Sequence, residues 1–98
     1  MLREQIIMTF HVTDEAIRNF QHEWGLKEGQ YVRIYAKYSG GGSDAFSVGL
    51  NVSVEPIDPA IVKTIGGYRF FVEKSDEWII RDARLSIDSG QEGIFFKL

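Results

Sequence analysis

A glycine-rich segment is the part of this 98-residue sequence that comes closest to a chemical motif. Its residues are Gly40, Gly41, Gly42, Ser43 and Asp44, and with Ala45 they formally satisfy G-x-G-x-x-A. A dinucleotide site of that pattern needs a helix directly after the loop, because the pyrophosphate binds at the helix N-terminus. Residues 46–54 instead alternate between apolar and other side chains with a period of two, which is typical of a strand. We therefore reject a dinucleotide site and expect a hairpin loop, with a binding role for the loop as the alternative.

The other residues that could carry chemistry are few and scattered. The sequence contains no cysteine, so it cannot build a disulfide, a thiolate zinc site or a cysteine-ligated iron–sulfur cluster from its own side chains. His11 and His22 lack the spacing of a metal-binding pair, and we expect two ordinary exposed or hydrogen-bonded side chains. The carboxylates at 14–15 and 76–77 are explained by the starts of two predicted helices. No nucleophile–base pair or acid–base pair can be named, so we expect no enzyme activity, no metal and no cofactor.

An aromatic and basic ladder is the one unusual surface that the pattern predicts. Tyr31, Arg33, Tyr35 and Lys37 alternate with apolar residues and should share one face of a strand. Such a face can stack single-stranded bases, or it can be packed under another element with Arg33 held over a ring. The chain has 11 basic and 14 acidic residues, and its net charge of −3 favours the second interpretation. The same charge argues against nucleic acid and anionic membranes as partners.

Composition and periodicity predict the elements that would position these residues. Hydrophobic residues make up 44% of the chain and charged residues 26%, close to globular averages, and 98 residues are enough for one domain. The predicted strands are 5–12, 31–38, 46–54, 61–65, 68–72, 83–88 and 94–98; the predicted helices are 14–24 and a short one that begins at Ser75. The strands at 31–38 and 46–54, and those at 61–65 and 68–72, are expected to form two hairpins. The sequence therefore predicts a β-rich α+β fold of small mixed sheets with one main helix after the first strand and a short second helix.

Both predicted helices have an expected buried face. Ala16, Phe20 and Trp24 repeat at four-residue spacing and should form the apolar stripe of the first helix. Residues 78–80, of sequence Trp-Ile-Ile, should form the buried turn of the second. No signal peptide is visible, and no apolar run approaches the roughly 20 residues needed to cross a bilayer. We expect a soluble cytoplasmic protein.

The order of these features resembles the HesB-like family, the fold of the A-type iron–sulfur carriers. The segments that carry the resemblance are VTDEAIRNF, GQYVRIYAKYSGGG, FSVGLNV, GGYRFFVEKSDEWIIRDARLSID and GQEGIFFKL. They cover nearly the whole chain, 1–98, as a single HesB-like domain. The resemblance implies a β-rich fold with a helix after the first strand and a role in iron–sulfur cluster biogenesis.

The residues that would hold a cluster in that family are missing here. The resemblance implies that typical members hold the cluster with three cysteines, one just after the loop glycines and two in a C-G-C tail. In this sequence Ser43 takes the loop position when counted back from Phe46, and Gly41 takes it when counted forward from Ser39. The sequence ends at Leu98, before such a tail. A serine hydroxyl cannot replace a soft thiolate at neutral pH, so the resemblance predicts the scaffold without its ligands.

Three functions follow as hypotheses. The first is a non-enzymatic, cysteine-free HesB-like domain that binds a protein or a small ligand rather than a cluster. The second is an adaptor in iron–sulfur assembly that shares a cluster with a thiolate-bearing partner, which makes an assembly protein a candidate partner. The third is small-molecule binding or catalysis at the glycine loop with Ser43, Asp44, Tyr35 and Lys37. Self-association through an edge strand at 94–98 also remains open.

Overall fold

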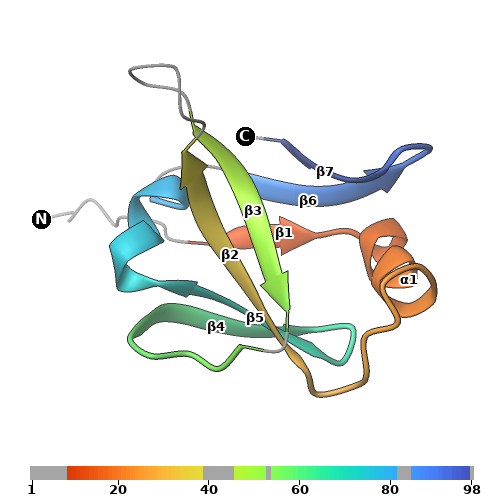
Figure 1. The fold of residues 1–98 in the computed structure, drawn as a ribbon, viewed down its shortest axis with the longest axis horizontal. Coiled ribbons are helices and arrows are strands. Elements are labelled where there is room, and N and C mark those ends of the chain that lie inside the picture. Colours follow the sequence, from red (N-terminus) through yellow and green to blue (C-terminus); the bar gives the residue numbers. More distant parts are fainter. Residues whose placement is uncertain (1–8, 39–45, 53, 82–84, 98) are drawn as a thin grey trace, which may run out of the picture.

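The structure is a β-rich α+β fold with two mixed sheets and one main helix, as the sequence predicts (Figure 1). The computed structural model describes residues 9–38, 46–52, 54–81 and 85–97. The elements are β1 (Phe10–Val12), α1 (Asp14–His22), β2 (Tyr31–Tyr38), β3 (Phe46–Val52), β4 (Pro59–Ile65), β5 (Tyr68–Glu73), the 3₁₀ helix η1 (Lys74–Ile79), β6 (Leu85–Gly90) and β7 (Gly93–Lys97). The predicted residues 5–8 and 83–84 of the strands lie outside the described residues.

The strands form one sheet of three and one of four. In the first sheet, of order β1-β6-β7, β6 is parallel to β1 and antiparallel to β7. In the second sheet, of order β3-β2-β5-β4, β2 and β5 are parallel and the two outer pairs are antiparallel. Both predicted hairpins, β2–β3 and β4–β5, are confirmed. The connection from β3 to β4 therefore leads from one edge of the four-stranded sheet to the other.

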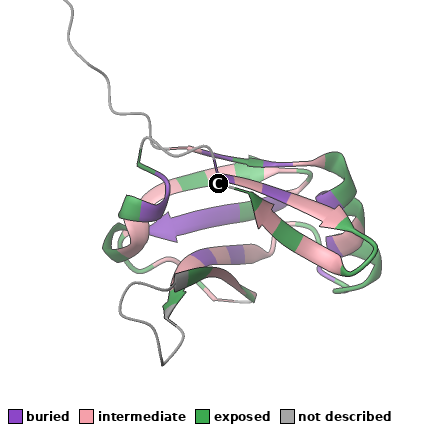
Figure 2. Ribbon diagram, turned by 90° about the horizontal axis from the view of Figure 1, so that it is seen from above, coloured by how far each residue is buried: buried purple, intermediate pink, exposed green. Residues whose placement is uncertain are grey.

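One hydrophobic core joins the two sheets and the helix. Phe70 of β5 lies at its centre, with its ring centroid 6.5 Å from that of Phe10 in β1 and 5.6 Å from that of Phe20 in α1. Figure 2 shows the buried residues inside the molecule and the exposed ones on its turns and outer surfaces. Alternate residues of β2, Val32 and Ile34, are fully buried in this core, which leaves their neighbours on the outer face of the sheet.

Helix α1 begins as predicted and ends earlier. The hydroxyl of Thr13 accepts a hydrogen bond from the N–H of Ala16 at 3.2 Å, which caps the helix. The helix ends at His22 instead of Trp24, and Trp24 is 41% exposed, so its predicted place in the buried stripe is wrong. Leu26 takes the buried position instead, because its N–H bonds back to the carbonyl of Phe20 and turns the chain inward.

The second helix and several strand ends also differ from the prediction. Element η1 is a 3₁₀ helix in which Ile79 and the following Ile80 are buried, but Trp78 is 42% exposed, contrary to expectation. Three consecutive residues of a helix point in different directions, so they cannot all face one core. Strand β3 ends before Val54, while β4 begins earlier, at Pro59. None of the described helices has the length and apolar character needed to cross a membrane.

Candidate functional site

The glycine segment of residues 40–44 lies outside the described residues, but the strands that lead into it are described. Strands β2 and β3 pair antiparallel from Tyr38 opposite Phe46 to Val32 opposite Val52. The chain after the segment is therefore a strand, and the helix that a dinucleotide site requires is absent from residues 46–52. The sheet face next to this segment belongs to the described part of the chain.

An aromatic and cationic platform lies on the outer face of β2 and β3. We define the Arg33–Tyr35 platform as Arg33, Tyr35, Gly49 and Asp76. The ring of Tyr35 lies against Gly49, since a Cβ atom built on Gly49 would be 2.7 Å from the Tyr35 Cζ atom. Residue 49 is thus required to be glycine for the ring to lie flat on the neighbouring strand. The aromatic ring of the platform belongs to Tyr35, three residues before Tyr38 at the end of β2.

The platform is held in place by a residue from a distant part of the chain. The guanidinium of Arg33 lies 5.5 Å from the centroid of the Tyr35 ring, and its Nη2 is 3.1 Å from Oδ2 of Asp76 in η1. The side chains of Arg33 and Asp76 are 33% and 13% exposed. Arg33 therefore lies over a ring, as one interpretation of the ladder predicts, and Asp76 joins it to η1, while Lys37 of the same ladder is exposed. The Nε of Arg33 is buried and has no acceptor among the described groups.

The other end of the ladder carries a second stacked pair. The guanidinium of Arg69 lies 4.8 Å from the centroid of the Tyr31 ring and donates a hydrogen bond of 3.0 Å to its hydroxyl. The Tyr31 ring meets Phe71 edge to face at 5.8 Å. Lys37, nearer the glycine segment, is exposed. A shallow pocket of about 380 Å³ lies beside Arg69 and is lined by Gly29, Gln30, Tyr31, Val54, Glu55 and Arg69.

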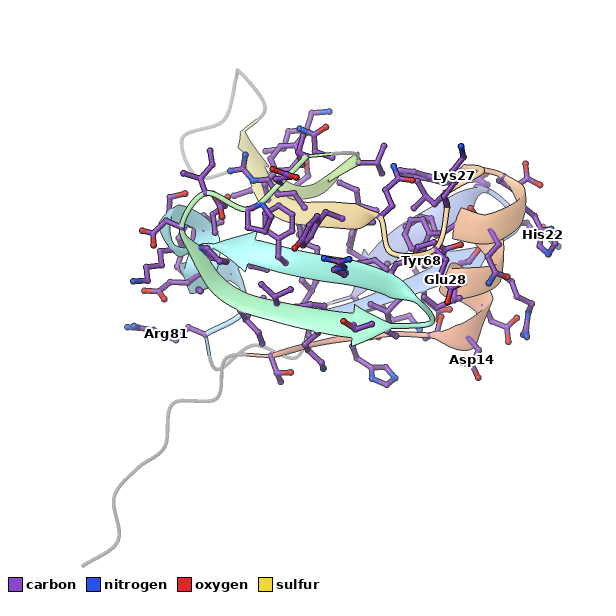
Figure 3. The ribbon with its side chains drawn as sticks, turned by 90° about the horizontal axis from the view of Figure 1, so that it is seen from below. Asp14, His22, Lys27, Glu28, Tyr68 and Arg81 are labelled. Atoms are coloured by element: carbon purple, nitrogen blue, oxygen red, sulfur yellow. The ribbon has the colours of Figure 1, made fainter. Side chains whose placement is uncertain are left out.

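The part of the chain that the structure describes holds no metal-binding cluster beside the platform. Among the described residues, no group of three or more His, Asp or Glu side chains could hold a metal ion. His11 and His22 are exposed, as expected, and Figure 3 shows His22 pointing outward from α1. An iron–sulfur cluster does not fit this chain, because hard oxygen donors are poor substitutes for thiolates and the sequence has no cysteine.

One buried acid was missed by the sequence analysis. Glu73 at the end of β5 is 8% exposed, and its carboxylate accepts hydrogen bonds from the N–H groups of Ile57 and Asp58, each 3.1 Å from Oε1. It anchors the connection between β3 and β4 and has a structural role. The prolines at 56 and 59 mark that segment as irregular, but neither indicates which side chain holds it.

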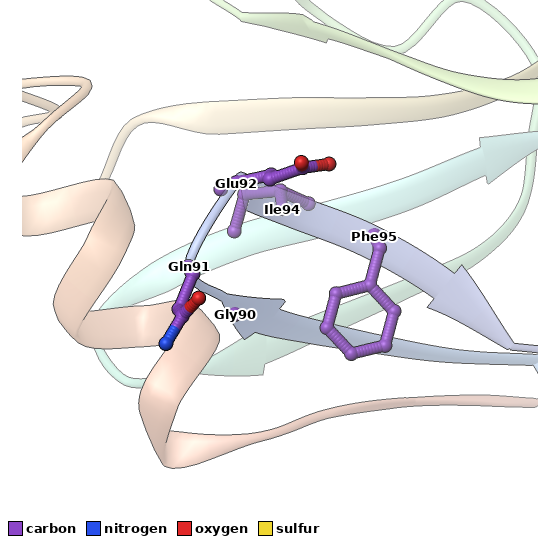
Figure 4. A pocket seen from close by; sticks show the side chains of 6 residues that line it. Gly90, Gln91, Glu92, Ile94 and Phe95 are labelled. Atoms are coloured by element: carbon purple, nitrogen blue, oxygen red, sulfur yellow. The ribbon is translucent and has the colours of Figure 1, made fainter.

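Two partly exposed aromatic residues border the turn between β6 and β7. Two shallow hollows share residues 90–93 (Figure 4 shows one of them). Phe95 borders the hollow of about 510 Å³, and Trp24 borders the hollow of about 430 Å³; these residues are 39% and 41% exposed.

The carboxyl group of Asp88 in β6 has a lowered pKa, because the N–H of Ser89 and the hydroxyl of Thr13 donate hydrogen bonds to it.

Comparison with known proteins provides no evidence about the function of this site. No protein-family model matches the chain, and no curated protein matches it. The stacked Arg33 and Tyr35 side chains, fixed by Asp76 and Gly49, are the best-defined polar surface next to the segment that the sequence analysis selected.

Proposed function

We propose that this protein is a non-enzymatic, cysteine-free HesB-like domain that binds a protein partner through the Arg33–Tyr35 platform. The observation that supports the proposal is the position of this platform on the β2–β3 hairpin, since the resemblance implies that the ligand position of the family lies in the segment 40–44 between these strands. The β-rich α+β fold and the helix that follows the first strand are consistent with the HesB-like kinship. The absence of any cysteine separates this chain from a carrier that holds its own cluster.

The chemistry of the platform suits recognition of a partner. Arg33 is two-thirds covered and pinned by Asp76, so little side-chain freedom is lost when a partner binds. Arginine and tyrosine are the residue types that most often dominate binding energy at protein interfaces. The exposed third of the Arg33 side chain belongs to a cation, which favours a partner group with an acceptor oxygen, such as a carboxylate or a backbone carbonyl.

The first prediction concerns the cluster. Anaerobic incubation of the protein with ferrous iron and sulfide is expected to give no stoichiometric iron–sulfur cluster, because the chain supplies no thiolate. The measurement is the visible absorption spectrum after desalting, together with iron and sulfide analysis. A charge-transfer band that remains with the protein at one cluster per chain would overturn the proposal.

The second prediction concerns the platform. Affinity purification from cells is expected to retain a specific partner with the wild type and to lose most of it with Arg33→Gln. A hot-spot arginine contributes about 2 kcal/mol or more, which corresponds to at least about a thirtyfold weaker complex. Arg18→Gln is the matched control, because Arg18 is 58% exposed on α1 and its ion pair is a local one with Glu15, three residues before it.

The outcomes of that purification separate the alternatives. Equal recovery of the same proteins with Arg33→Gln and with the wild type would exclude the platform as the binding surface. Recovery of an iron–sulfur assembly protein would favour the adaptor hypothesis over a general binding module. Circular dichroism of each variant checks that the fold survives the substitution.

A further inference from the structure

Strand β7 is a free edge of the three-stranded sheet. The order β1-β6-β7 leaves one side of Gly93–Lys97 without a partner strand among the described residues. An unpaired edge presents a row of N–H and C=O groups that another strand can bind. Its residues Ile94, Phe95 and Phe96 are apolar, and Phe95 is 39% exposed.

Two of the other edges carry features that oppose strand addition. Strand β1 has three residues within the described part of the chain, and the ammonium of Lys63 donates to the carbonyl of Phe10 at 2.9 Å. Strand β4 begins with Pro59 and has a register shift between Pro59 and Ile61. The remaining edge, β3, has no charged side chain between Phe46 and Val52 that could specify a pairing register.

Strand β7 carries opposite charges at its two ends. Glu92, in the turn before the strand, and Lys97, its last residue, are both exposed. Within the described part of the chain Glu92 forms no ion pair, and Lys97 lies 3.8 Å from Asp88. Antiparallel pairing of two copies would bring Lys97 of each copy beside the turn that carries Glu92 of the other, whereas parallel pairing would bring like charges together. The edge is therefore electrostatically complementary to itself in one direction only.

We propose that the chain forms a two-fold dimer in which β7 pairs antiparallel with β7 of a second copy, with Phe95 on the symmetry axis. Gly90 and Gly93 are partners across a two-residue turn, so alternation along the hairpin directs the backbone groups of Ile94 and Phe96 to the free edge. Pairing about Phe95 sets Ile94 of each copy opposite Phe96 of the other, so all of these backbone groups find partners.

The hollow beside β7 fits the lysine that this register would bring. Lys97 of the second copy would lie opposite Gly93, where a Cβ atom would meet nothing within 4 Å. The hollow there is lined by Glu92 and by Phe95, and Figure 4 shows Phe95 leaving the strand in a different direction from Ile94. Because a glycine occupies position 93, the aliphatic part of the incoming lysine has room to reach the carboxylate of Glu92.

The test is sedimentation velocity of the full chain and of two charge-reversal variants over a wide range of concentration. The wild type is expected to show a concentration-dependent dimer. Lys97→Glu and Glu92→Lys, each alone, should raise the dissociation constant about tenfold, because two like-charge contacts replace two opposite-charge ones. An equimolar mixture of the two variants should restore the dimer, since both ion pairs re-form in the mixed species.

The mixture separates an interface from a purely structural effect. Lys97→Glu also places a carboxylate near Asp88 of its own chain, and adding the other variant cannot relieve that repulsion. Lys27→Glu is the control, an exposed lysine in the loop after α1, and should dimerise like the wild type. A wild-type monomer at all concentrations, or a mixture no more associated than its components, would overturn the proposal.

Discussion

The buried carboxylate of Glu73 shows how a single residue fixes a long connection. It accepts hydrogen bonds from two consecutive N–H groups, those of Ile57 and Asp58, and the N–H of Lys74 donates to the carbonyl of Asp58 at 2.9 Å. The side chain of Ile57 next to this anchor is 89% exposed. The connection is therefore held through its backbone, while its apolar side chain contributes little burial.

Replacing Glu73 by alanine is expected to lower the free energy of unfolding by about 2–3 kcal/mol, because two backbone donors lose a charged acceptor. Glu73→Gln should cost less, since the amide oxygen still accepts. Urea denaturation measures the loss, and amide hydrogen exchange should accelerate most at Ile57 and Asp58. A loss below about 0.5 kcal/mol, typical of an ordinary surface change, would show that the carboxylate is not the anchor.

At the scale of elements, the turn of the β4–β5 hairpin packs directly on helix α1. Gly66 in that turn has φ +60°, and a Cβ atom built on it would lie 2.7 Å from Cγ2 of Ile17. On the other side of the turn, the N–H of Gly29 donates to the carbonyl of Gly67 at 2.7 Å. The turn therefore ties the helix, the segment before β2 and the four-stranded sheet together.

Gly66→Ala is expected to destabilise the protein by about 1–3 kcal/mol more than Gly25→Ala, because only the first introduces a methyl group into packed atoms. Gly25 is the matched control: its φ is +65°, so alanine is strained to the same degree, but nothing lies within 4 Å of the built Cβ. Thermal and urea denaturation of both variants give the difference. Adding Ile17→Val to Gly66→Ala should recover part of it, and equal losses for the two glycines would refute the contact.

At the scale of the whole molecule, the two sheets share one core, and Phe70 connects them. Phe70 and Phe71 are adjacent in β5 and both are fully buried, but they face opposite sides of the sheet. Phe70 meets Phe10 of the three-stranded sheet and Phe20 of α1, whereas Phe71 meets Tyr31 of its own sheet. The two side chains are equally buried, so their different roles come from the side of the sheet that each one faces.

Phe70→Ala is expected to cost about 3–5 kcal/mol, a large part of the stability of a domain of this size. Phe71→Ala, the matched control, should leave the contact between the sheets intact. Native-state hydrogen exchange measures the difference. In Phe70→Ala, the amides of β1 and β6 should lose more protection than the loss of global stability explains, and in Phe71→Ala they should not. The same exchange pattern in both variants would show that Phe70 does not join the sheets.

Local patterns in the sequence determined most elements and much of the ladder. Period-two alternation located β2, β3 and β6, and the glycine pair at 66–67 located the hairpin of β4 and β5, because these signals depend on neighbouring residues. The same alternation put Arg33 and Tyr35 on one face. This face lies on the outside of the sheet, because the alternate residues Val32 and Ile34 are buried.

Only the tertiary structure decided which strands pair and what holds the site. The parallel contacts of β2 with β5 and of β1 with β6 join distant segments, and no local pattern encodes them. Asp76 lies 43 residues from Arg33, and Glu73 reaches back across a connection to its N–H partners. Trp24 and Trp78 are half-exposed although hydrophobicity predicts burial, because the core is filled by residues that the fold brings closer. Strand pairing, the long-range contacts of Asp76 and Glu73 and the exposure of the two tryptophans depend on how all the elements pack together. Periodicity along the chain indicates only which side of a single element is apolar.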